Sequence, residues 1–395
     1  MQRRDFIRGA AFAAAGCLAP GFRLLSGRYA AESEAVRREA LRLVAEKLFL
    51  GIAVGRNDCS EPVYVGCSGP ADDATPVDEL TRFDLASLTK TVTASVCATL
   101  VTDGLLDPDA PFTEYFPEHV LGKSCEITVR DLATHSSGFG NFSGRRYCED
   151  PARHGGASGF ESELREKRPA RPRGTYCYSC YNYALLSTVA ERAGGKSLDR
   201  LATERVFGPL GMTRSGWWPV ADDGHVVEVP LRMKDGKLRK VGEVHDEVAR
   251  YAGRPIGNAG VFSTLPDMTR FVEDLLERKT FPAAHYDLLF NGTFKKGKVC
   301  RSFGFDLGEN RPEGFSSAAI HHSGFTGQFL CVDPELSFAG VVLTLRSPCA
   351  EGTLTARRRL LSLYSGCLPS TSGCPRQDTW ASRLPRVSSL CLSVV

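Results

Sequence analysis

The sequence has almost no net charge and no segment of the kind that binds a charged macromolecule. Among its 395 residues, 49 lysines and arginines stand against 46 aspartates and glutamates, a formal charge of +3. No basic stretch is interleaved with aromatic residues, so a nucleic-acid groove is not expected. Internal repeats are absent as well. The 42% hydrophobic and 24% charged residues are average for a soluble globular protein, which excludes disordered, collagenous and coiled-coil chains.

Cysteine is abundant, but the sequence lacks the spacing of a metal or redox site. Cys177 and Cys180 have C-x-x-C spacing, yet no second such pair completes a zinc site and no thioredoxin-like context surrounds them. If Cys17 is lost with a leader or taken by a lipid, 13 of the 14 cysteines remain, so at least one thiol stays free. We therefore expect buried thiols packed in the core, or incidental disulfides, and no bound metal.

The N-terminus has the features of an export signal. Arg3 and Arg4 precede a short, weakly apolar run at 9–19, which is typical of a twin-arginine signal peptide. The run is too short to span a bilayer. The residues before Cys17 also look like a degraded lipoprotein cleavage box, so a lipid anchor is a second hypothesis. Residues 1–31 are predicted to direct export to a bacterial periplasm or outer surface; a basic start that merely frays is the alternative.

The apolar pattern predicts a sheet assembled from both ends of the chain. Residues 32–49 have helical spacing, and two short apolar runs that suggest a hairpin follow them. Four more short runs are expected strands, and a helix is expected after them. The hairpin runs are 49–54 and 62–65, the later strands are 303–307, 318–322, 328–333 and 338–345, and the final helix is 353–364.

These elements predict an α+β domain over residues 32–365. Its antiparallel sheet comes from about 32–80 and 300–365 and is flanked by the N- and C-terminal helices. The chain between reads mostly as helices and turns, so it is expected to form a large inserted helical lobe, with a ligand cleft against the sheet. Residues 366–395 turn to Ser, Pro, Cys and Arg without periodicity and are expected to be a disordered tail.

The candidate chemistry begins with a serine and a lysine three residues apart. Ser87 and Lys90 form the only S-x-x-K in the chain, where a helix is expected to begin. Residues i and i+3 share a helix face, so the amine can lie beside the hydroxyl. A lysine whose pKa is lowered by burial and nearby cations can remove the serine proton, and the helix N-terminus can stabilise an oxyanion. The alternative is an N-cap serine with an exposed lysine.

Longer stretches around this pair resemble one family. The stretches are 83–91, 103–107, 115–117, 127–138, 209–213, 244–247 and 257–271. In this order they are similar to segments of the serine β-lactamase-related hydrolases, which include class C β-lactamases, D-alanyl-D-alanine carboxypeptidases, D-aminopeptidases and esterases. The resemblance covers about residues 32–346, and its order is more specific than any single motif. It implies a β-lactamase/transpeptidase-like fold and acyl-enzyme chemistry, with no metal or organic cofactor.

The resemblance implies a second catalytic residue, Tyr178, in a segment similar to the family's Y-S-N motif. A phenol beside Ser87 and Lys90 could relay the serine proton to the leaving group. An aromatic side chain packed in the helical lobe is the alternative. Cys180 stands where the family usually has Asn or Asp. A thiol donates and accepts hydrogen bonds poorly, so substrate binding is expected to differ from that of relatives.

A third part of the site is expected in the segment 321–327, which resembles the family's K-T-G or H-x-G strand motif. His322 takes the Lys/His place and could present an electropositive or hydrogen-bonding group to a substrate carboxylate. Gly324 permits a close backbone approach. The N–H groups of Phe325 and Ser87 are then expected to form the oxyanion hole.

Two other histidines are not expected to act on the substrate. His321 precedes the motif histidine on a strand, so its side chain is expected to face away. His135 is interpreted as structural, shaping the turn before Gly138.

Together these residues predict an exported serine hydrolase that acts on an ester, amide or β-lactam carbonyl. The substrate is a small molecule or a peptidoglycan-derived compound, and the sequence leaves its class open, as it does the oligomeric state. Two departures from the family pattern support a second hypothesis. They are Cys180 and Leu345, which precedes Arg346 where relatives commonly have Asn. Under this hypothesis the protein is a catalytically impaired family member that binds cell-envelope material.

Overall fold

A computed structural model describes the chain in eight stretches. They are residues 30–58, 61–68, 75–142, 156–218, 225, 242–308, 310–346 and 352–367. The expected export signal, with Cys17, lies outside these residues apart from Ala30 and Ala31, which begin the first helix. The expected tail lies outside them from residue 368 onward.

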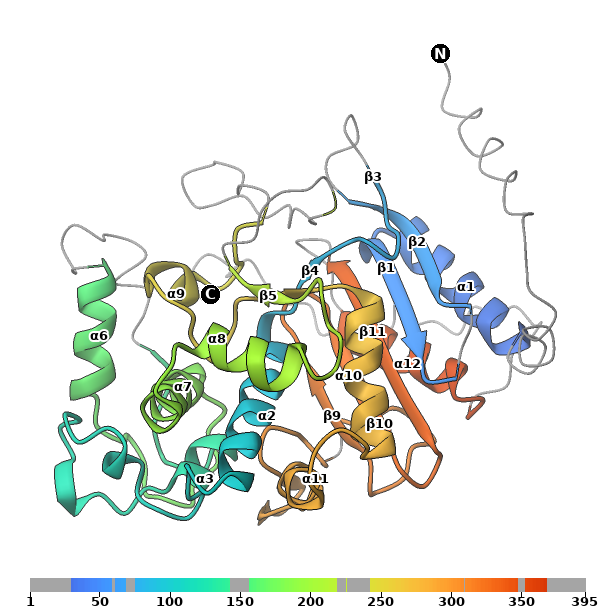
Figure 1. The fold of residues 1–395 in the computed structure, drawn as a ribbon. Helices are drawn as coiled ribbons and strands as arrows, with labels where there is room; N and C mark the ends of the chain where they lie inside the picture. Colours follow the sequence, from blue (N-terminus) through green and yellow to red (C-terminus); the bar gives the residue numbers. More distant parts are fainter. Residues whose placement is uncertain are drawn as a thin grey trace, which may run out of the picture.

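The main sheet joins the two ends of the chain, as predicted. Its six strands run in the order β3-β2-β1-β11-β10-β9, and each neighbouring pair is antiparallel. In Figure 1 the blue N-terminal strands lie beside the orange C-terminal ones. The strands are β1 (Phe49–Arg56), β2 (Val63–Ser68), β3 (Thr75–Pro76), β9 (Ile320–Ser323), β10 (Phe329–Asp333) and β11 (Phe338–Arg346).

Side chains alternate between two apolar layers on the two faces of this sheet. Ile52 and Val54 of β1 pack with α1 (Ala30–Ala45) and α12 (Thr353–Tyr364), the predicted terminal helices. Ala53, between them, faces the opposite layer, which contains α10 (Leu265–Glu277). The period of two along a strand thus buries both faces of the sheet.

The inserted lobe is helical and is built around α2 (Thr89–Thr102). Every residue of α2 from Thr89 to Leu100 is buried, so this helix forms the centre of the lobe. The other helices of the lobe are α3 (Val129–Ala133), α6 (Gly156–Glu166), α7 (Cys180–Gly194), α8 (Leu198–Ala202), α9 (Glu247–Tyr251) and α11 (Ala283–Phe290). The predicted α+β fold is therefore confirmed.

Short strands between the lobe and the main sheet were not expected from the sequence. A three-stranded sheet, β4-β6-β5, joins β4 (Phe83–Asp84), β5 (Gly216–Trp217) and β6 (Val261–Ser263). A separate hairpin pairs β7 (Phe294–Lys296) with β8 (Val299–Arg301). The expected strand at 303–307 is wrong, because Gly304 adopts φ +101° and Ser302 N donates to Phe305 O, which makes a turn. Only Asp306 bridges to neighbouring strands there.

Candidate active site

The serine and the lysine meet at the start of the central helix. Ser87 lies in a short 3-10 turn, η1 (Ala86–Leu88), that leads directly into α2. Lys90 Nζ donates a hydrogen bond to Ser87 Oγ over 2.9 Å, and the lysine side chain is buried. The i, i+3 geometry is thus as predicted. The alternative of an N-cap serine with an exposed lysine is wrong.

The backbone just before Ser87 is strained. Ala86 has φ +46°, a conformation that residues other than glycine rarely adopt. The Asp84 carboxylate fixes this turn, because its Oδ1 accepts from Ala86 N at 2.8 Å and its Oδ2 accepts from His245 N at 2.7 Å. Such strain costs on the order of 1–3 kcal/mol. It leaves Ser87 partly exposed between the buried neighbours Ala86 and Leu88.

Lys90 is held as an ammonium ion. Its Nζ donates to Ser87 Oγ at 2.9 Å and to Asn258 O at 2.8 Å, and it contacts Cys180 Sγ at 3.6 Å. These contacts account for the three N–H groups of a protonated lysine. Burial lowers the pKa of Lys90, but the surrounding side chains, Cys180 and Tyr178 foremost, raise it by more, so the pKa lies above its usual value. The expectation of a lowered lysine pKa is therefore wrong.

Tyr178 lies over this lysine at the exposed side of the site. Its ring centroid is 5.2 Å from Lys90 Nζ, and the side chain is 40% exposed. His135 is fully buried and packs its ring 4.5 Å from that of Tyr178, while its Nδ1 accepts a hydrogen bond from Ser179 N. His135 also has φ +60° in the turn before Gly138. Its expected structural role is confirmed, and the structure extends that role to Tyr178.

Cys180 begins α7 directly behind Tyr178. Burial raises the pKa of its thiol, and the Lys90 ammonium beside it offsets only part of that rise. Its 3.6 Å contact with Lys90 Nζ has an ordinary length for a sulfur acceptor, but sulfur accepts a hydrogen bond only weakly. The backbone N–H of Cys180 donates to Asn141 Oδ1 at 3.1 Å. The thiol therefore completes the surroundings of the lysine more weakly than an amide oxygen would.

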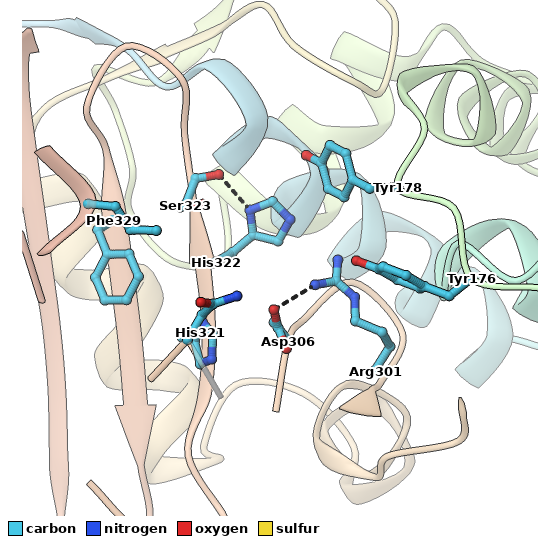
Figure 2. Close-up of a pocket in the computed structure, with 10 residues that line it drawn as sticks. Tyr176, Tyr178, Arg301, Asp306, His321, His322, Ser323 and Phe329 are labelled. Atoms are coloured by element: carbon cyan, nitrogen blue, oxygen red, sulfur yellow. Dashed lines mark hydrogen bonds and ion pairs between the residues drawn. The ribbon is translucent and has the colours of Figure 1, made fainter. Parts of the chain in front are cut away.

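His322 faces the tyrosine from the opposite wall. In Figure 2 its ring lies near that of Tyr178, and their centroids are 6.3 Å apart. Burial, Arg301 and Lys90 hold the pKa of His322 well below 6.5, so the ring is neutral. Of the two expected roles, the electropositive one is wrong and the hydrogen-bonding one remains. Its Nδ1 lies 3.0 Å from Ser323 O, which leaves Nε2 on the other edge of the ring.

A cavity of about 260 Å³ lies between β9 and the segment that carries Tyr178. His321 turns away from His322, as predicted, and stacks against Phe329 at 5.9 Å, yet it still lines the cavity (Figure 2). Arg301 and Tyr176 lie on the other side of the cavity. Sequence reasoning did not select either residue. Arg301 lies outside every motif, and its position appears only when β8 folds against the site.

Gly324 and Phe325 lie in the turn after β9, close to the nucleophile. A Cβ at Gly324 would lie 2.7 Å from Leu85 O, so only glycine permits this approach. Thr326 Oγ1 donates to Asp84 O at 2.9 Å, which ties the turn to the strand before Ser87. The Phe325 side chain is 58% exposed and its ring lies 5.0 Å from that of His245. The oxyanion role of the Phe325 N–H stays a prediction that fits this placement.

Asn258 and Asp246 also belong to the surroundings of the lysine. Asn258 O accepts from Lys90, and its Nδ2 donates to Asp246 Oδ1 at 3.2 Å. Both residues lie in segments that resemble the family, so their positions were marked in the sequence, although no role was assigned to them.

The described residues contain neither a cluster of metal ligands nor a helix that could cross a membrane. No group of three or more His, Cys, Asp or Glu side chains that could hold a metal ion occurs among them. Within the same stretches, the helices are too short or too polar to cross a membrane.

Comparisons with known proteins agree with this geometry. The Beta-lactamase family model matches residues 36–364. A protein of Escherichia coli (strain K12), provisionally named as a D-alanyl-D-alanine carboxypeptidase, is 26% identical over an alignment of 318 residues that covers 69% of this chain and 71% of that protein. Esterase EstB of Burkholderia gladioli is 29% identical over an alignment of 282 residues that covers 64% of this chain and 71% of the esterase.

The fold also has solved neighbours. A crystal structure of a class C beta-lactamase in complex with cefoxitin superposes with a TM-score of 0.68, covering 84% of this chain and 98% of the other. The two sequences are 19% identical. The likeness establishes the β-lactamase/transpeptidase-like fold that the sequence predicted.

Proposed function

The chain belongs to the beta-lactamase family, and we propose that it is a serine hydrolase that works through an acyl-enzyme on Ser87. The observation that carries the proposal is the buried Lys90 ammonium, which donates to Ser87 Oγ at 2.9 Å beside a half-exposed phenol. An ester, amide or lactam carbonyl is the substrate group. The names of the relatives, a carboxypeptidase and an esterase, support these classes.

In the first step, Ser87 Oγ attacks the carbonyl carbon. Its proton passes to Tyr178, which gives its own proton to the departing oxygen or nitrogen, so the carbonyl–leaving group bond breaks as the ester to Ser87 forms. Lys90 stays protonated and stabilises the negative charge that develops on Ser87 Oγ and on the phenolic oxygen of Tyr178. The N–H groups of Ser87 and Phe325 hold the oxyanion. Water then releases the acid and restores the Ser87 hydroxyl.

Two features favour a catalyst over the alternative, a binding module for envelope material. They are the strained turn at Ala86 and the buried, hydrogen-bonded ammonium of Lys90. Ala86 at φ +46° and a buried ammonium at Lys90 both cost stability. A protein that only binds a ligand has no need of either feature. The weak Cys180 contact alone supports the alternative.

Acylation by a labelled fluorophosphonate and a labelled penicillin tests the proposal. We expect label on the wild type and none on Ser87→Ala. Ser95→Ala is the matched control, because Ser95 is a buried serine of the same helix α2 whose Oγ has no hydrogen-bond partner among the described residues. Label that persists in Ser87→Ala refutes the nucleophile. A folded wild type that takes up neither label favours the binding module.

Hydrolysis assays then separate the substrate classes. The purified protein is offered p-nitrophenyl esters, nitrocefin and D-alanyl dipeptides. A class is assigned only where turnover disappears in Ser87→Ala and persists in Ser95→Ala.

Export to a bacterial periplasm or outer surface is the second half of the proposal. It rests on Arg3, Arg4 and the short apolar run after them. Replacing both arginines by lysine should stop export of the full chain through the twin-arginine route. Unchanged export of that variant refutes the signal.

A further inference from the structure

A buried side-chain amide takes the place of a strand partner at one end of the main sheet. Gln328 is 1% exposed and stands just before β10, whose pairing with β11 begins at Phe329 opposite Val342. Gln328 Oε1 accepts from Thr344 N at 2.7 Å, and Gln328 Nε2 donates to Thr344 O at 3.1 Å. A primary amide offers the same kinds of donor and acceptor as a peptide group. The side chain of Gln328 therefore holds β11 as a further residue of a strand would.

The same amide reaches the strand that leads to the nucleophile. Gln328 Nε2 also donates to Asp84 O over 2.8 Å. Asp84 is the last residue of β4, and its carboxylate accepts from Ala86 N at 2.8 Å, directly before Ser87. The buried amide thus has an acceptor for each of its two N–H bonds and a donor for its oxygen. It joins β11 to the residue that holds the turn of Ser87.

The backbone of Gln328 closes the turn that carries Phe325. Gly324 N donates to Gln328 O at 2.8 Å. Arg357, a buried residue of α12, donates from its Nη1 to Gln328 O at 2.7 Å and to Gly324 O at 2.9 Å. Hydrogen bonds from α12 therefore hold the backbone of this turn, and the side chain of Gln328 joins the turn to β4.

We propose that Gln328 is a positioning residue for the oxyanion hole and sets the spacing between the N–H groups of Ser87 and Phe325. The inference rests on the proposed function, in which these two groups hold the oxyanion. Gln328 and Asp84 are 244 residues apart in the chain, so no local structure sets the distance between their segments. A displacement of about 1 Å at a reacting group can cost about 10²-fold in rate. The hydrogen bond between the amide and Asp84 O supplies the missing constraint.

A matched ester and thionoester measure the geometry of the oxyanion hole. The probes are p-nitrophenyl acetate and O-p-nitrophenyl thionoacetate, in which sulfur replaces the carbonyl oxygen. Sulfur accepts hydrogen bonds weakly, so a well-formed oxyanion hole favours the oxygen ester. The ratio of the two kcat/KM values does not depend on the fraction of protein that is folded. It therefore reports the site and not the stability of the variant.

Removing the amide should weaken the preference for the oxygen ester. Gln328→Met keeps the length of the side chain without its hydrogen bonds. It should lower the ester-to-thionoester ratio about 10-fold, less than the roughly 10²- to 10³-fold cost of losing an oxyanion donor outright. kcat and kcat/KM for the ester should fall together, because the oxyanion forms only after the substrate is bound. Thr326→Val removes the other side-chain hydrogen bond to Asp84 O, at 2.9 Å, and should shift the ratio in the same direction.

Asn57→Leu is the matched control. Asn57 is buried directly after β1, and its side-chain amide also pairs with backbone groups at β11. Its Oδ1 accepts from Ala339 N at 2.7 Å, and its Nδ2 donates to Ser337 O at 3.1 Å. These groups lie at the opposite end of β11 from Thr344. The control should therefore lower the stability of the sheet and leave the ester-to-thionoester ratio unchanged.

The outcomes separate the two proposals. A ratio that falls in Gln328→Met and not in Asn57→Leu supports the positioning role. Ester turnover that requires Ser87, with a ratio that is unchanged in Gln328→Met or equally lowered in Asn57→Leu, overturns the positioning role and keeps the hydrolase. If Gln328→Met does not fold, the ratio in Thr326→Val decides in the same way.

Fluorophosphonate labelling covers the case in which the wild type hydrolyses no ester. The phosphoryl oxygen of the probe then takes the place of the oxyanion. The labelling rate of Ser87 should be about 10-fold lower in Gln328→Met than in Asn57→Leu, and equal rates overturn the positioning role. A folded wild type that takes up no label overturns both proposals.

Discussion

Replacing His285 by phenylalanine should make the folded protein less sensitive to acid. His285 is 1% exposed in α11, and its ring stacks on Phe281 with a centroid distance of 4.3 Å. Burial lowers the pKa of His285 to about 4. Its Nδ1 has no hydrogen-bond partner among the described residues. The folded protein therefore keeps this imidazole neutral at pH values where an unfolded chain protonates it.

The sign and the size of this change in the free energy of unfolding follow from proton linkage. An unperturbed histidine has a pKa near 6.5. Below this pH the unfolded state binds a proton that the folded state does not, so the free energy of unfolding decreases as the pH is lowered. Each pH unit costs about 1.4 kcal/mol, so one such histidine costs about 2 kcal/mol between pH 6.5 and pH 5. The loss continues until the pH reaches the folded pKa of about 4. Phenylalanine removes this contribution because it does not titrate.

Urea unfolding at pH 7 and pH 5 measures the effect. The wild type should lose about 2 kcal/mol more than His285→Phe between these pH values. The other histidines with a lowered pKa, such as His321, contribute to both proteins and cancel in the difference. Phe281→Leu disturbs the same stack without removing a titrating group. Its free energy of unfolding should therefore fall between pH 7 and pH 5 by as much as that of the wild type. Equal losses in the wild type and in His285→Phe would refute a neutral buried imidazole.

Three further variants test the catalytic geometry. Lys90→Met removes the buried ammonium and should slow fluorophosphonate labelling of Ser87 by about 10²- to 10³-fold, with circular dichroism unchanged; labelling at the wild-type rate contradicts this. His135→Asn tolerates the positive φ but loses the ring contact with Tyr178, so kcat should fall about 10-fold, and less in a Tyr178→Phe background. Additive losses in that double-mutant cycle would show that the two residues act separately. Gly324→Ala places a Cβ 2.7 Å from a backbone oxygen beside the nucleophile and should lower kcat/KM at least 10-fold, and an unchanged value refutes the close approach.

The ends of the fold could be predicted because their signals are local. The hairpin β1–β2, the strands β9–β11 and the helix α12 each show a clear apolar period between turn residues. The strands β4, β5 and β6 have two or three residues each, too few for any period to appear. At 303–307 the sequence F-G-F-D-L has apolar alternation, but the positive φ of Gly304 turns the chain back. A strand and a turn share that pattern, and only the packing decides between them.

Within the site, residue identity could be predicted and protonation could not. The spacing of Ser87 and Lys90 is enough to place the amine beside the hydroxyl. The pKa of Lys90 instead depends on Cys180, Tyr178 and Asp246, which come from distant parts of the chain. Sequence reasoning anticipated burial, which lowers a lysine pKa, but the acidic surroundings that raise it appear only in the folded protein.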